Sequence, residues 1–246
     1  MKSIVFLGAK AVGCYCLQYL QDHSKELDIE VIAVGIGNAS KAHQKSNIQL
    51  IAEKYHIPIL QSLDDLPECD FILSIQYHKI LKAKHIAKAR QLAVNLHMAP
   101  LPEYRGCNQF SFAILDEAEI FGTTLHQLEV GIDSGAILAE KRFSIPKGCW
   151  VQDLYQLTLT ASRQLFAESI ADILEGKYTP ILQSELITER GTSYHFRKEI
   201  NDIKQIDLQW SADKIERHIR ATYFPPFEPP YTVIEGKKVY FHRENL

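Results

Sequence analysis

The chain has no run of apolar residues near the ~20 that a membrane-spanning helix needs. Its first apolar stretch is short, because Gly8 and Lys10 interrupt it. A signal peptide requires a longer apolar region followed by a small-residue cleavage site. We therefore expect a cytoplasmic protein with no membrane partner, whose first residues form a buried strand.

Basic patches and metal-ligand patterns are also scarce. The formal net charge is -3 and no stretch concentrates lysine and arginine, so a nucleic acid is not the expected partner. The five cysteines are odd in number and match no zinc spacing, so we expect free thiols and no metal. These cysteines are Cys14, Cys16, Cys69, Cys107 and Cys149.

The first half of the chain alternates short, continuously apolar runs with segments of helical periodicity. Such an alternation is typical of a parallel sheet covered by helices on both faces. Strands are expected at residues 3–7, 31–36, 71–75 and 92–96, with a short one near 57–60, and helices at 11–20, 47–55 and 83–89. The predicted fold is α/β, with a Rossmann-like, mostly parallel sheet that binds ligands at the carboxyl ends of its strands.

The pattern changes beyond residue 120. Two strand-like runs, at residues 122–128 and 136–145, predict a long antiparallel hairpin, and a long amphipathic helix is expected at 151–174. Aromatic residues and prolines accumulate beyond about residue 187. We therefore expect a main domain at residues 1–186 and a small appendage at 187–246, which ends in a β-hairpin around Glu235-Gly236.

The turn after the first predicted strand resembles a dinucleotide-binding fingerprint but lacks its central glycine. Lys10 stands between Gly8 and Gly13, where that glycine would let the backbone approach a pyrophosphate. No acidic residue ends the second predicted strand to hold a ribose hydroxyl. A nicotinamide cofactor, and with it a dehydrogenase, is therefore not expected, and a tight strand-to-helix turn is the simpler interpretation.

Two polar side chains, Asn95 and His97, end the apolar strand predicted at residues 92–96. Residues two apart on a strand share a face, so both should project together near the carboxyl edge of the sheet. A lone histidine in such a place is often a core residue satisfied by backbone groups. The loop that follows, Pro100-Leu101-Pro102-Glu103-Tyr104-Arg105-Gly106, favours a site instead, because its prolines make it rigid.

A third segment, Gly131-Ile132-Asp133-Ser134-Gly135, follows about 25 residues further on. In their order and spacing the three segments resemble the folate-dependent formyltransferases, a family that includes glycinamide ribonucleotide, methionyl-tRNA and sugar N-formyltransferases. The resemblance covers residues 1 to about 185. It implies a Rossmann-like sheet with a catalytic trio of Asn95, His97 and Asp133.

The chemistry of formyl transfer agrees with these residue types. An amine attacks the formyl carbon, an oxyanion develops, and the folate nitrogen leaves. Asn95 supplies an amide N–H for the oxyanion, and His97 relays the proton from the amine to the leaving nitrogen. Asp133 orients the imidazole and favours its charged form, although an aspartate in a turn also commonly caps its own backbone.

The resemblance also implies a folate-binding loop after the strand at residues 71–75. We assign folate binding to Gln76, Tyr77 and Ile80 of this loop and to Asp133, with 10-formyltetrahydrofolate as the co-substrate. A polar strand-to-helix loop without a ligand is the alternative interpretation.

The acceptor is suggested by residues 107–114 and 220–227, which look most like the sugar N-formyltransferases. That branch usually formylates a dTDP-linked 4-amino-4,6-dideoxysugar, as in lipopolysaccharide O-antigen biosynthesis. Aromatic side chains suit the thymine, and arginine or lysine suits the pyrophosphate. The aromatic tail also suits a dimer surface, so a homodimer is expected. The residues expected to bind the acceptor are Met98, Tyr104, Arg105, Asn108, Gln109, Arg220 and Tyr223.

Other activities stay open at this stage. Methionyl-tRNA formyltransferases carry a larger carboxyl-terminal domain than the roughly 60 residues present here, and glycinamide ribonucleotide formyltransferases usually lack a comparable aromatic tail. A non-catalytic folate or nucleotide-sugar binding protein is a different class, and the intact trio argues against it because a sensor needs no proton relay.

Overall fold

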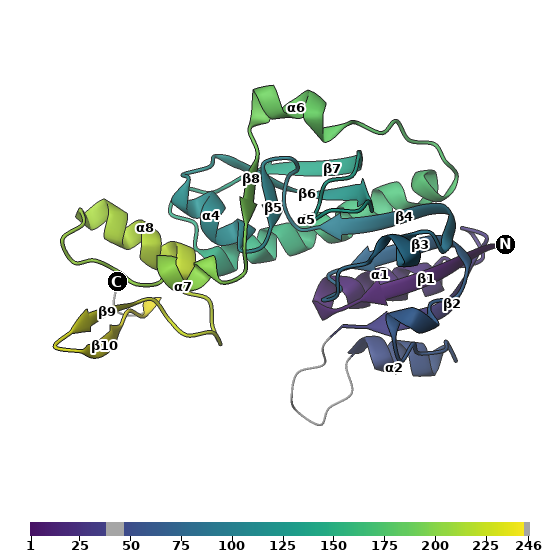
Figure 1. Ribbon diagram of the computed structural model, residues 1–246, viewed down its shortest axis with the longest axis horizontal. Coiled ribbons are helices and arrows are strands. Elements are labelled where there is room, and N and C mark those ends of the chain that lie inside the picture. Colours follow the sequence, from purple (N-terminus) through teal and green to yellow (C-terminus); the bar gives the residue numbers. More distant parts are fainter. Residues whose placement is uncertain (38–46, 244–246) are drawn as a thin grey trace.

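The computed structural model describes residues 1–37 and 47–243, and its centre is a six-stranded sheet (Figure 1). The strands lie in the order β2-β1-β3-β4-β6-β7. The first four in this order are parallel, whereas β6 runs antiparallel to both β4 and β7. Their bounds are Lys2–Gly8 for β1, Ile29–Ile36 for β2, Cys69–Ile75 for β3, Ala89–His97 for β4, Ile120–Gln127 for β6 and Ile137–Ser144 for β7. The predicted α/β fold with a mostly parallel sheet is confirmed.

The sheet is covered on both faces because its central strands are apolar on both. On β1, Ile4 and Phe6 point to one face and Val5 and Leu7 to the other, and all four are fully buried. The first face packs against α1 (Lys10–Asp22), α2 (Asn47–Lys54) and α5 (Val151–Leu174). The second packs against the shorter η1 (Leu63–Asp65) and α3 (Ala83–Ile86). Within the ranges described, none of the helices combines the length and hydropathy of a membrane span.

Two elements of the first half differ from their prediction. The short strand expected near residues 57–60 is reduced to a bridge between Val34 and Ile59, because Pro58 has no N–H to extend the pairing. The helix expected at residues 83–89 ends at Ile86, since β4 already begins at Ala89, which pairs with Cys69 of β3.

The second half of the chain connects the sheet to the carboxyl-terminal segment, residues 187–243. After β4, the short β5 (Tyr104–Gly106) leaves the sheet and pairs in parallel with β8 (Ser193–His195). The helix α4 (Gln109–Leu115) packs against α8 (Ala212–Thr222), at the end of the molecule opposite α2 (Figure 1). The remaining elements are α6 (Gln183–Arg190), α7 (Glu199–Ile203), β9 (Tyr231–Ile234) and β10 (Lys237–Tyr240).

Both hairpins expected from turn residues are present. The strands β6 and β7 pair antiparallel, and Glu235-Gly236, both with positive φ, connect β9 to β10. The boundary expected between residues 186 and 187 lies inside α6, and the division into a main domain and an appendage stays a prediction.

Candidate functional site

The sequence motifs meet at the carboxyl end of β4, beside its antiparallel neighbour β6. The sheet register places His126 opposite Asn95 and Thr124 opposite His97. The loop between β6 and β7 brings Asp133 to both histidines. Its Oδ2 lies 3.6 Å from His97 Nδ1, and its Oδ1 lies 3.6 Å from His126 Nε2. Asn95, His97 and Asp133 therefore share one site, with His126 as a fourth member that the motifs did not indicate.

His97 has the contacts of a neutral base. Its side chain is buried, and Nε2 donates a hydrogen bond to the Tyr104 carbonyl oxygen at 2.7 Å. Since that carbonyl only accepts, the proton sits on Nε2 and the Nδ1 lone pair faces Asp133. Burial lowers the pKa of His97, and the Asp133 carboxylate and the Tyr104 carbonyl oppose this only in part. A neutral imidazole with a free lone pair can accept a proton from an attacking group.

Asp133 is held as an ionised carboxylate. Its backbone has a φ of 50°, the left-handed conformation that aspartate tolerates in turns. Burial raises its pKa, but the positive charges of protonated His97 and His126 in acid and the Gly106 N–H outweigh burial, so the pKa lies well below its ordinary range. The hydrogen bond from the Gly106 N–H to Oδ2 measures 2.9 Å and joins residues 27 positions apart. This contact goes beyond the local backbone capping that is common for an aspartate in a turn.

Side chains from two other elements fix the Asp133 loop. The Arg105 guanidinium donates to the Ile132 carbonyl at 2.9 and 3.2 Å. Gln183, a buried residue of α6, donates to the carbonyls of Asp133 and Gly135 at 2.8 and 2.7 Å. Arg105 was assigned to the acceptor from sequence; in the structure its guanidinium supports the loop, and its contact with an acceptor stays a prediction.

The loop assigned to folate follows β3. Because β3 and β4 are parallel neighbours, it lies at the same edge of the sheet as His97. Gln76 has a positive φ and accepts a hydrogen bond from Lys10 Nζ at 3.1 Å. Tyr77 packs partly buried against the second face of the sheet, and Ile80 is 68% exposed. These two side chains offer apolar surface at the ligand edge of the sheet.

Two basic side chains that were not assigned to binding lie at this edge. Lys10 follows β1 and Gln76 follows β3, so their hydrogen bond spans the point where the strand order reverses, a common ligand site in such sheets. Burial lowers the pKa of Lys10, and the nearby charge of Arg197 lowers it further. Arg197, from the carboxyl-terminal segment, is exposed. Two positive charges close enough to repel each other suit an anionic ligand.

Three residues assigned to the acceptor lie close along the chain to this site but differ in exposure. Met98 is buried in the main core, which leaves only its backbone for a ligand. Asn108 Nδ2 donates to the carbonyls of Phe196 and Arg197 at 2.9 and 3.2 Å, and so ties the start of α4 to the carboxyl-terminal segment. Gln109 begins α4 and is partly exposed.

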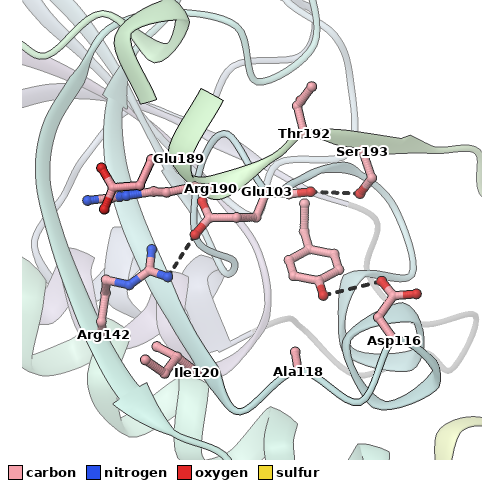
Figure 2. Close-up of a pocket in the computed structure, with 10 residues that line it drawn as sticks. Glu103, Asp116, Ala118, Ile120, Arg142, Glu189, Arg190, Thr192 and Ser193 are labelled. Carbon is pink, nitrogen blue, oxygen red and sulfur yellow. Dashed lines mark hydrogen bonds and ion pairs between the residues drawn. The ribbon is translucent and has the colours of Figure 1, made fainter. Parts of the chain in front are cut away.

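The carbonyl and the side chain of Tyr104 contact two different parts of the structure. Its carbonyl accepts a hydrogen bond from His97, while the residue also lines a cavity of about 580 Å³, whose other lining residues include Asp116 and Arg142 (Figure 2). There its hydroxyl donates to Asp116 at 3.3 Å, and Arg142 pairs with Glu103 at 2.7 Å. A ligand contact of the Tyr104 side chain would therefore lie in this cavity rather than beside the His97 imidazole.

Arg220 and Tyr223 lie at the end of α8 with partners of their own. Arg220 donates to the Cys149 carbonyl at 3.0 Å and to the Glu216 carboxylate at 2.9 Å. The Tyr223 ring meets Trp150 edge-on, with centroids 5.9 Å apart. These contacts form a cluster separate from the catalytic trio, and the predicted nucleotide contacts of both residues stay predictions.

An amide donor, a neutral imidazole and an ionised carboxylate at the edge of an α/β sheet define a candidate group-transfer site of the acid–base type. In the part of the chain that the structure describes, no group of histidine, cysteine and acidic side chains is arranged to hold a metal.

Comparison with known proteins identifies the family. Residues 49–170 match the family model described as formyl transferase. The GDP-perosamine N-formyltransferase of Brucella melitensis is 29% identical over 171 residues, which are 70% of this chain and 63% of that protein, less than two thirds of its length. The N-formyltransferase from Helicobacter canadensis, solved in complex with folinic acid and dTDP-3-aminofucose, matches with a TM-score of 0.78 at 25% identity, over 97% of this chain and 86% of that one. The chain belongs to the formyl transferase family.

A relative from another branch matches over more of the sequence. The methionyl-tRNA formyltransferase of Lactobacillus gasseri is 27% identical over 250 residues, which are 97% of this chain and 77% of that protein. Membership of the family therefore leaves the acceptor to be argued from the site.

Proposed function

We propose that this protein transfers the formyl group of 10-formyltetrahydrofolate to the amino group of a nucleotide-linked sugar. The shared site of Asn95, His97 and Asp133 carries the proposal, because it combines an oxyanion donor with a base and its counter-charge. Two relatives support the acceptor class, one named for GDP-perosamine and the other solved with dTDP-3-aminofucose. The resemblance of residues 107–114 and 220–227 favours a dTDP-linked 4-amino-4,6-dideoxysugar within this class.

In the proposed mechanism, His97 carries one proton from the acceptor to the donor. The amine attacks the formyl carbon, and its proton passes to the Nδ1 lone pair of His97. The imidazolium that results lies 3.6 Å from the Asp133 carboxylate, which stabilises its charge. When the bond between the formyl carbon and folate N10 breaks, that nitrogen takes the proton from Nδ1. The products are the formylated amine and tetrahydrofolate, and His97 is neutral again.

Asn95 acts on the formyl oxygen in this mechanism. As the amine adds, that oxygen becomes negative, and an N–H already aimed at it stabilises the charge without reorganisation. The Asn95 N–H stabilises the ground state little, because the formyl oxygen is still neutral there. Its contribution is therefore to kcat rather than to binding.

The two ligands are proposed to approach from different elements. Ile80 and Tyr77 offer apolar surface to the folate after β3, and the Asp133 loop bounds the reacting end. Lys10 and Arg197 are proposed to meet the diphosphate of the acceptor, because Lys10 lies at the strand-order reversal and the charge of Arg197 acts on it. Arg220, assigned to that role from sequence, has its guanidinium on Cys149 and Glu216.

Two arginines of the carboxyl-terminal segment test this division. We expect Arg197→Gln to raise KM for the nucleotide sugar about tenfold, the worth of one charge-assisted hydrogen bond. We expect Arg220→Gln to lower the melting temperature instead, because α8 loses its bond to the Cys149 carbonyl. KM for both substrates and thermal unfolding should be measured for each variant. The opposite pattern, with the KM effect at Arg220, would favour the assignment made from sequence.

The function itself is tested with a panel of amines. The protein is incubated with 10-formyltetrahydrofolate and dTDP-linked 3-amino- and 4-aminosugars, a GDP-linked 4-aminosugar, glycinamide ribonucleotide and methionyl initiator tRNA, and products are read by mass. We expect the nucleotide sugars to gain one formyl group fastest. Faster formylation of the tRNA would overturn the acceptor class, as the Lactobacillus gasseri relative would suggest. The net charge of -3 argues against a polyanionic tRNA as the partner.

The proposal extends to the location, the oligomeric state and the pathway of the protein. We propose a cytoplasmic homodimer whose product is a building block for lipopolysaccharide O antigen. The β9–β10 hairpin supports the dimer, because it exposes the apolar side chains of Val233, Ile234 and Val239. Sedimentation velocity tests the oligomeric state, and a monomer at assay concentration would contradict it.

A further inference from the structure

His126 is a second buried histidine of the site, and both of its ring nitrogens have partners. It is 1% exposed and lies opposite Asn95 across the β4–β6 pair. Its Nδ1 lies 2.9 Å from the Gln127 carbonyl oxygen, and its Nε2 lies 3.0 Å from Asn95 Nδ2. The proton relay through His97 uses neither nitrogen.

These contacts determine the tautomer of His126. A carbonyl oxygen only accepts hydrogen bonds, so the single ring proton of the neutral imidazole lies on Nδ1, which donates a hydrogen bond to the Gln127 carbonyl. Nε2 is then an unprotonated acceptor, and Asn95 Nδ2 is the donor that meets it. The nearest oxygen of Asp133 lies 3.6 Å from Nε2, too far for a hydrogen bond to that atom.

The tautomer in turn determines which end of the Asn95 amide faces His126. With the amide reversed, Asn95 Oδ1 would meet the Nε2 lone pair, and two acceptors would be buried against each other. In the observed orientation, one Nδ2 hydrogen binds His126 and the second remains for a ligand. An amide free to turn would present its oxygen as readily as its nitrogen, and an oxygen repels a developing oxyanion.

We infer that His126 is a positioning residue that holds Asn95 with its N–H toward the formyl oxygen of the substrate. The inference rests on the proposed formyl transfer and deepens it. His126 itself touches no substrate. It acts through the Asn95 amide, and the Gln127 carbonyl sets the tautomer that lets it do so.

Two substitutions separate the roles of the two ring nitrogens. Glutamine places an oxygen near the position of Nε2 and keeps an acceptor for Asn95, whereas asparagine reaches only the position of Nδ1. We expect His126→Asn to lower kcat about 10- to 100-fold with little change in either KM, because a misplaced oxyanion donor is felt in the transition state. We expect His126→Gln to stay within about fivefold of wild type. Equal losses in both variants would overturn the inference.

The matched control is His23→Asn, which changes a histidine whose Nδ1 also contacts a backbone carbonyl, that of Tyr19, at the far end of α1. It should have wild-type kinetics. Folate binding by calorimetry confirms that each variant is folded. If His126→Asn fails this check, His126→Gln still decides, because a 100-fold loss in that variant would contradict the inference.

A double-mutant cycle tests whether His126 acts through Asn95. In an Asn95→Ala background, His126→Asn should lower kcat no further, since the amide that it positions is gone. A second loss of full size would overturn the inference and indicate another route, such as one through Asp133.

Nitrogen-15 NMR of labelled histidine gives a readout of the His126 tautomer that does not depend on turnover. We expect a protonated Nδ1 and a bare Nε2, and the reverse would overturn the inference. An inactive wild type would instead refute the proposed function and leave this tautomer test valid.

Discussion

Replacing His97 by asparagine is expected to lower kcat by about 100-fold or more, the usual worth of a positioned acid–base group. Asparagine has no basic lone pair to take the proton of the amine at the site of Nδ1. The folate should bind with near-normal affinity, because the relay acts only after the ligands are bound. Single-turnover kinetics with saturating donor and acceptor measure the chemical step directly.

A second substitution distinguishes the loss of the proton relay from a defect in folding. His97→Gln keeps an amide near the position of Nε2, where the histidine donates to the Tyr104 carbonyl. This variant should retain the local structure better than His97→Asn and be comparably slow. Near-normal turnover by either variant, once folate binding shows that it is folded, would remove His97 from the proton relay.

Asp133→Asn is expected to lower kcat by about 100-fold as well, although the substitution changes only the charge. The asparagine oxygen can still accept the hydrogen bond from the Gly106 N–H, so the loop should keep its shape. The imidazolium that forms on His97 then loses its counter-charge. Thermal unfolding and folate affinity, measured beside kcat, separate this effect from a disturbed loop.

The pH profile of Asp133→Asn tests independently whether Asp133 acts on His97. The relay needs neutral His97, so kcat should fall as the pH drops through the pKa of His97, which burial places below its ordinary value of 6.5. The Asp133 carboxylate raises that pKa, so removing it should move the acid limb of the profile to lower pH. An acid limb that stays in place would mean that Asp133 does not act on His97.

The part of the site that follows from strand periodicity is predictable from sequence. Asn95 and His97 share a face because they are two residues apart on one strand, and the turn at Asp133 is marked by its glycines. His126 lies 31 positions from Asn95 and meets it only through the antiparallel register of β6. A one-residue shift of that register would turn His126 to the other face, and hydropathy does not specify the register in this strand.

Residues that act through tertiary contacts are harder to find. Gln183 of α6 donates to a carbonyl of the Asp133 loop, and the charge of Arg197, which follows β8, acts on Lys10. Neither residue stands in a recognisable motif. Arg220 shows the opposite case. Its place beside aromatic residues suggests a ligand contact, but a carboxylate four positions earlier and the Cys149 carbonyl engage its guanidinium.

The short β5 strand limits how this protein can be recombined with its relatives. Its Tyr104 carbonyl holds His97, its Gly106 N–H holds Asp133, and its only strand partner in the described structure is β8. Gly106 has a φ of 85°, and a side chain there would clash with the His195 carbonyl. Exchanging the carboxyl-terminal segment between relatives would therefore also alter the placement of His97. A working chimaera has to inherit β5 and β8 from the same parent.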